Sequence, residues 1–131
     1  AELAEVLQAV LETPISPELI PPQNGEISQR TEDLVGPYEL HDFFLYHWLR
    51  FGSSPTKIFA LACRSFRDDY AAELIKRWLA EFFRRFMTQQ FKRTTLPPGP
   101  KVGSVSLSPR GDWRMPDEAG FAHLVAEIEA L

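Results

Sequence analysis

The segment from Gln90 to Arg114 places the strongest constraint on how this chain can fold. It leaves a long helical pattern and then runs through roughly twenty residues without helix or strand periodicity, which compact domains rarely keep. It holds four prolines, three glycines, and five basic residues against one acid, Asp112. Its apolar residues, Trp113 among them, argue against a solvated tail. We therefore expect an ordered, basic, proline-stiffened loop suited to an anionic ligand.

Hydrophobic periodicity elsewhere predicts a mostly α fold of about five helices. The expected helices cover residues 1–12, 38–51, 54–66, 68–93 and 117–131. Two long irregular segments, at 13–37 and 94–116, join these helices. The evidence for a strand is limited to a weak alternation of side chains at 102–107.

Residues at the expected helix ends support these boundaries. Gly52 suits the position just after a helix, and Ser54-Pro55 suits the N-cap and first turn of the next. Asp68 or Asp69 is expected to cap the longest helix.

Composition fits one domain, residues 1–131, in a soluble protein with 44% hydrophobic and 24% charged residues. No apolar run approaches the ~20 residues of a membrane span, and no secretory signal is present. One cysteine, Cys63, excludes an internal disulfide, so a reducing, cytoplasmic setting is expected. The long loops and the nearly all-apolar helix at 38–51 indicate a piece of a larger protein.

Charge is segregated along the chain. Residues 1–40 carry eight acids and one base, whereas residues 64–114 carry eleven bases and five acids. Such a basic middle can attract phosphates, or it can pair with the acidic ends of the same chain. Both interpretations stay open at this point.

Lys92 and Arg93 are the first candidate site residues. At a helix end they either complement the negative end of the helix dipole or bind a phosphate or carboxylate. The tripeptide Arg110-Gly111-Asp112 is expected to form an internal Arg–Asp ion pair that pins the loop.

The three histidines are well separated, so no metal site is predicted. Basic residues among the aromatic residues give only a weak indication of nucleic-acid binding.

Several segments together resemble the C-terminal part of the synthetase domain of bacterial glutamine-dependent NAD synthetase. They are TPISPEL (13–19), TEDLVGPYELHDFFLYHWLRFG (31–52), SPTKI (54–58), QQFKR (89–93) and LPPGPKVGSVSLSPRGDWRMP (96–116). They follow one another in order over nearly the whole chain.

The resemblance implies an adenine-nucleotide hydrolase-like α/β domain, of which this chain is a fragment. The complete enzyme makes NAD from deamido-NAD, ATP and ammonia with Mg, and a nitrilase-like domain releases the ammonia from glutamine. ATP adenylates the nicotinate carboxylate, and ammonia displaces AMP. The complete enzyme acts as a homo-oligomer, with no membrane or nucleic-acid partner.

The resemblance also suggests roles for single residues. Phe91 and Lys92 match a family pair whose lysine contacts deamido-NAD. Ser16 takes the place of a hydroxyl residue near ATP, although Pro17 replaces a small residue there. Arg93, Lys101, Arg110, Asp112 and Trp113 are expected to support the loop and the site.

The chain lacks two motifs that the family has. It has no SGGxDS pyrophosphate loop and no glutaminase nucleophile, because Cys63 does not match that context. We therefore expect an excised C-terminal fragment without catalytic residues and without activity alone. The alternative is a helical interaction module whose basic face binds acidic partners or nucleic acid.

Overall fold

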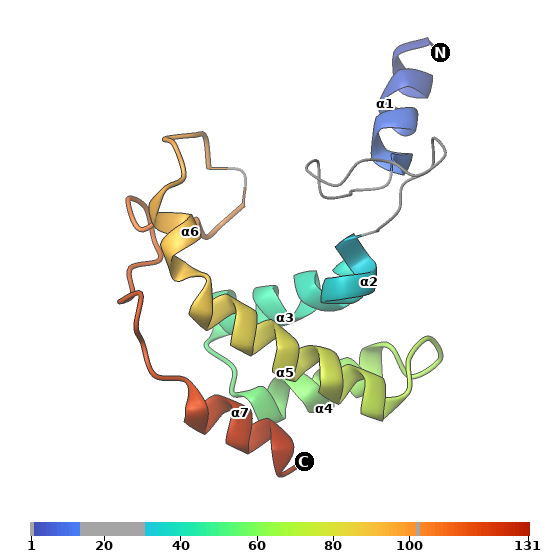
Figure 1. Cartoon of the computed structure of the whole chain (residues 1–131). Coiled ribbons are helices and arrows are strands. Elements are labelled where there is room, and N and C mark those ends of the chain that lie inside the picture. The colour runs from blue at the N-terminus through green and yellow to red at the C-terminus, as the bar shows by residue number, and fades with distance from the viewer. Residues whose placement is uncertain (1, 14–30, 102) are drawn as a thin grey trace, which may run out of the picture. The chain divides into compact units, whose positions relative to one another are not determined.

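The computed structural model describes residues 2–13, 31–101 and 103–131 of the chain. These residues form seven helices and no strand, so the mostly α prediction is confirmed. The helices are α1 (Glu2–Glu12), α2 (Thr31–Val35), α3 (Tyr38–Phe51), α4 (Pro55–Ser65), α5 (Ala72–Thr88), α6 (Gln90–Thr94) and α7 (Ala122–Glu129) (Figure 1). The chain divides into two units, Ala1–Pro37 and Tyr38–Leu131.

The first unit contains α1 and α2. The apolar stripe of α1 is solvent-exposed, and the exposed fractions of its side chains run from 56% at Val6 and Leu7 to 80% at Leu11. The stripe consists of Leu3, Val6, Leu7, Val10 and Leu11. The helix α2 lies inside the segment predicted to be irregular, and it ends at Gly36, whose φ of 94° suits glycine. The Gly36 amide donates to the carbonyl of Glu32 at 2.8 Å.

The second unit is built around α5, against which α3, α4 and α7 pack (Figure 1). Seven residues of α5 are buried: Ile75, Trp78, Leu79, Phe82, Phe83, Phe86 and Met87. They recur every three or four residues, so one broad face of the helix supplies most of the core. The partners contribute Leu40 and Phe44 from α3, Ile58 and Ala62 from α4, and Leu124 and Ile128 from α7.

The junction between α3 and α4 forms as predicted. Gly52 has a φ of 58°, and the amides of Gly52 and Ser53 donate to the carbonyls of Trp48 and His47 at 3.0 and 3.2 Å. The bond from Gly52, in the left-handed conformation, to Trp48 is the αL pattern that closes a helix. Ser54 then accepts a hydrogen bond from the Lys57 amide at 3.3 Å.

The predicted start of the longest helix is wrong. The helix α5 begins at Ala72, and Asp68 and Asp69 lie in a turn before it. The amides of Asp69 and Tyr70 donate to the Phe66 carbonyl, and the rings of Phe66 and Tyr70 pack against the core. Burying these two rings holds the chain in a turn where the capping signal predicts a helix.

Two further boundaries differ from prediction. The longest helix breaks at Gln89, after which α6 starts. The last helix begins at Ala122 and not near residue 117, because Gly120 disfavours helix and Phe121 packs into the core. Residues 103–107 form no strand, since the Ser106 amide donates to the Asp112 side chain at 2.7 Å. The irregular character of residues 95–101 and 103–116 is confirmed.

Candidate functional site

The first four side chains of the short helix α6 differ in exposure. Gln90 is fully buried, whereas Phe91 is 51% exposed and Lys92 is exposed. Arg93 lies between these extremes. The predicted binding pair therefore faces solvent, and its two neighbours face the protein.

Arg93 joins α6 to the last turns of α5. Its Nε donates to Gln90 Oε1 at 2.8 Å, and its Nη2 donates to the carbonyl oxygen of Phe86. Its guanidinium carbon stands 4.3 Å from the centroid of the Phe86 ring. Burial lowers the pKa of Arg93, which nonetheless stays a cation at neutral pH. Of the two alternatives for Arg93, the structure shows the contact with a helix end, because its guanidinium donates to a carbonyl in the last turn of α5.

Gln90 joins α6 to the end of the loop. Its Nε2 donates to the Met115 carbonyl at 3.3 Å. Next to Met115, Trp113 packs edge-on against Phe86 with centroids 5.5 Å apart and lies 6.4 Å from the Trp48 ring. The loop predicted from sequence is thus tied to the core at its C-terminal end.

The middle of the loop is held by its own charged residues. Lys101 Nζ lies 2.6 Å from Asp112 Oδ2, the oxygen that also accepts from the Ser106 amide. The hydrogen bond from Lys101, followed by that from Ser106, holds the pKa of Asp112 below its usual value. Gly111 sits against Ser106, where an added Cβ would lie 3.0 Å from the hydroxyl oxygen.

The predicted Arg110–Asp112 ion pair is wrong. Arg110 donates instead to the carbonyl of Leu96, and Asp112 pairs with Lys101. The reason is geometric, because Gly111 turns back toward Ser108, whose carbonyl accepts its amide at 2.9 Å. Arg114 likewise donates to a loop carbonyl, that of Pro109, at 3.1 Å.

Lys92 differs from the other cations of this region. In the described part of the chain, its Nζ makes no hydrogen bond and no ion pair, and it stands 6.0 Å from the centroid of the neighbouring Phe91 ring. Its charge is therefore available to a ligand, whereas those of Arg93, Lys101 and Arg110 already contact protein oxygens.

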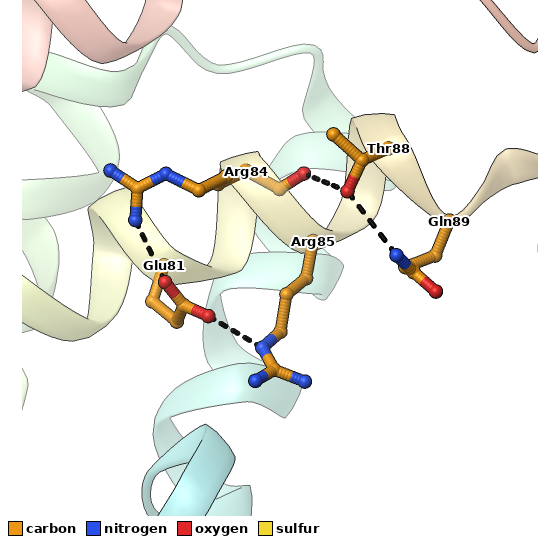
Figure 2. Close-up of polar contacts among 5 residues, drawn as sticks. All are labelled: Glu81, Arg84, Arg85, Thr88 and Gln89. Atoms are coloured by element: carbon orange, nitrogen blue, oxygen red, sulfur yellow. Dashed lines mark hydrogen bonds and ion pairs between the residues drawn. The ribbon is translucent and has the colours of Figure 1, made fainter.

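The basic face of α5 is partly neutralised by its own acid. The Glu81 carboxylate accepts hydrogen bonds from Arg84 Nη1 at 2.8 Å and from Arg85 Nε at 2.6 Å (Figure 2). The Thr88 hydroxyl donates to the Arg84 carbonyl. Burial alone would raise the pKa of Glu81, but the hydrogen bonds from Arg85 and Arg84 outweigh it and lower the pKa. Charge pairing within the chain thus accounts for part of the basic middle.

Two surface concavities lie in the second unit, and neither is lined by Phe91 or Lys92. The larger has a volume of about 720 Å³ between α5 and residues 117–129, and the smaller, about 350 Å³, lies between α3 and residues 103–105. Because both side chains are exposed, the predicted binding pair is a surface feature of this chain.

Sequence reasoning missed Gln90 as a structural centre. The buried positions of α5 recur at residues 79, 82, 83, 86 and 87, and the same spacing reaches Gln90. A polar residue at a core position needs a partner, and that signal was available. Ser16, the predicted ATP-proximal residue, lies outside the described residues.

The described ranges show neither a metal-binding cluster nor a membrane-spanning helix. Within residues 2–13, 31–101 and 103–131, no three His, Cys, Asp or Glu side chains are grouped so that they could hold a metal ion. None of the helices there has the length and apolarity needed to cross a bilayer.

Comparison with known proteins gives relatives but no family model that matches. The chain is 41% identical over 146 aligned residues to the glutamine-dependent NAD(+) synthetase of Mycobacterium leprae, covering 98% of the chain and 22% of that protein. It is 43% identical over 135 residues to the enzymes of the same name from Mycobacterium bovis and Mycobacterium tuberculosis, covering 89% of the chain and 20% of each. The chain spans about a fifth of the length of these relatives. It is therefore homologous to a segment of glutamine-dependent NAD(+) synthetase.

Proposed function

We propose that residues 1–131 form one fragment of the synthetase domain of a glutamine-dependent NAD synthetase, from its C-terminal region. The fragment supplies structural elements and one wall of the deamido-NAD site, and it is inactive alone. The rest of the synthetase would supply the ATP-binding half and the nitrilase-like glutaminase, in a cytoplasmic homo-oligomer. The support is the similarity to a fifth of each mycobacterial enzyme.

The observation that carries the site proposal is the pair Phe91 and Lys92. Both side chains face solvent on α6, and the Lys92 ammonium has no partner among the described residues. A lysine is a compact point charge that suits a carboxylate or phosphate, and an exposed aromatic ring offers a face for stacking. Deamido-NAD presents all of these features: a pyrophosphate, a nicotinate carboxylate and flat rings.

In the reaction, this wall would bind and orient. ATP with Mg would convert the nicotinate carboxylate to its adenylate with release of pyrophosphate, and ammonia from glutamine would then displace AMP to give NAD. Lys92 would hold a negative group of deamido-NAD through the reaction, so it lowers the free energy of binding without taking or giving a proton.

The alternative, an interaction module with a basic face for acidic partners or nucleic acid, has less support. Arg84 and Arg85 are paired with Glu81, and Lys76 donates to the Glu129 carbonyl at 3.2 Å. Partners that these cations already have would compete with phosphates. Affinity for generic DNA that falls steeply with salt would favour the alternative.

The test is Lys92→Ala in the complete synthetase that contains this segment. Loss of one charge-assisted contact costs about 1.5–3 kcal/mol, so we expect kcat/KM for deamido-NAD to fall about 10- to 150-fold. The matched control is Lys57→Ala, which removes an exposed lysine from the first turn of α4. Steady-state kinetics with deamido-NAD as the varied substrate gives both values. Equal kinetics for wild type and Lys92→Ala would remove Lys92 from the site.

A further inference from the structure

The helix α6 is too short to define its own orientation. It has five residues, whereas isolated helices shorter than roughly 12–15 residues are marginal in water. The directions of Phe91 and Lys92 must therefore be set by contacts that α6 makes with the rest of the second unit.

Two side chains make the main contacts, and the Thr94 hydroxyl adds a longer one to Asp117 Oδ1 at 3.4 Å. Arg93 stacks on the Phe86 ring and donates to both the Phe86 carbonyl and Gln90 Oε1. Gln90, fully buried, uses its amide nitrogen for the Met115 carbonyl. Both ends of the Gln90 amide are thus engaged, and the chain of contacts runs from α5 through α6 to the end of the loop.

This arrangement flanks the binding pair on both sides in sequence. Gln90 precedes Phe91, and Arg93 follows Lys92. Because both flanking residues are anchored to the protein, the helix cannot rotate about its axis without breaking the anchors. The helix therefore presents the two middle residues in one direction.

We propose that Gln90 and Arg93 are positioning residues, which fix the direction in which Phe91 and Lys92 meet deamido-NAD. The inference rests on the proposed function of Lys92. It adds that the site depends on a buried amide and a half-buried guanidinium that do not touch substrate.

The experiment uses the complete synthetase with Arg93→Lys and, separately, Gln90→Met. Arg93→Lys keeps the charge but loses the planar fork that stacks and donates twice. Gln90→Met keeps the volume and removes both hydrogen bonds. We expect KM for deamido-NAD to rise about 10-fold or more, towards the ~100-fold that a misplacement of about 1 Å can cost. We expect KM for ATP and kcat to change less than twofold.

A merely structural role would give another pattern. Partial unfolding lowers the fraction of active enzyme, so kcat would fall while KM for deamido-NAD stayed constant. That pattern in both variants, or unchanged kinetics in both, would overturn the inference. Two variants at different residues keep the test valid if one of them fails to fold.

The same substitutions are then made in a Lys92→Ala background. If the two residues act through Lys92, their effect on KM shrinks to less than about twofold there, since effects on one shared contact are not additive. Full additivity would contradict the positioning role while leaving Lys92 in the site. No effect of Lys92→Ala alone would overturn the proposed function, and the positioning inference with it.

Discussion

Gln90 and Phe91 are adjacent in sequence, but one is fully buried and the other half-exposed. The resemblance to known synthetases singled out the exposed pair, Phe91 and Lys92, and the structure does place both at the surface. The spacing of the buried positions of α5 reaches Gln90 and predicts its burial, but its partner, the Met115 carbonyl, is 25 residues away. Long-range partners of this kind do not show in local periodicity.

The same limit explains the error at Asp112. Sequence proximity favoured Arg110 as its partner, but the loop brings Lys101 to the carboxylate at 2.6 Å. The charge of the loop could be predicted from composition, whereas the pairing depended on how the backbone turns at Gly111.

At this scale the pH dependence of Asp112 can be tested. Its pKa is lowered by Lys101 and the Ser106 amide, so these bonds are fully present above the ordinary pKa of 3.8 and are lost as pH falls through the lowered value. We expect the NMR shift of the Ser106 amide proton to titrate with a midpoint below 3.8. Asp112→Asn should abolish that step. A midpoint at or above 3.8 in the unmodified chain would show that the contact is absent in solution.

At the scale of elements, core-facing stripes could be predicted and boundaries could not. The stripe of α5 and the Gly52 and Ser54-Pro55 junction follow from spacing and local backbone preferences. The helix α5 starts at Ala72 because Tyr70 packs against the core before it. The helix α7 starts at Ala122 because Phe121 does the same. Tertiary burial outweighs a capping signal of about 1 kcal/mol.

One contact between elements also lay beyond sequence reasoning. Glu127 of α7 accepts from the Thr56 amide at 2.9 Å and from the Thr56 hydroxyl at 2.6 Å. The first turn of α4 has free amides, so this carboxylate acts as a second cap from 71 residues away. It complements Ser54, which caps the Lys57 amide.

We expect Glu127→Ala to destabilise the chain through the start of α4. Losing a cap costs about 0.5–2 kcal/mol, and the free energy of unfolding should fall by that amount. Urea denaturation followed by circular dichroism measures it. Glu118→Ala, which removes an exposed carboxylate ahead of α7, serves as the control. Equal losses in the two variants would mean that the bond to Thr56 adds nothing.

At the scale of the whole molecule, the chain spans about a fifth of each mycobacterial relative. Its long loops suggested a fragment before any comparison, because helices in small bundles are usually joined by short links. The exposed stripe of α1 and the surface position of Lys92 fit a molecule that supplies one wall of a shared site. Periodicity could not identify the ligand proposed for that wall, because hydrophobic spacing reports burial and not ligand chemistry.

The most direct test of the fragment proposal is NAD formation by the purified 131-residue chain, supplied with ATP, Mg, deamido-NAD and ammonia. The complete synthetase, assayed at equal molar concentration, is the positive control. We expect no NAD above the blank without protein, because the chain has no SGGxDS loop to hold ATP. Turnover by the chain alone would contradict its role as one part of a larger active site.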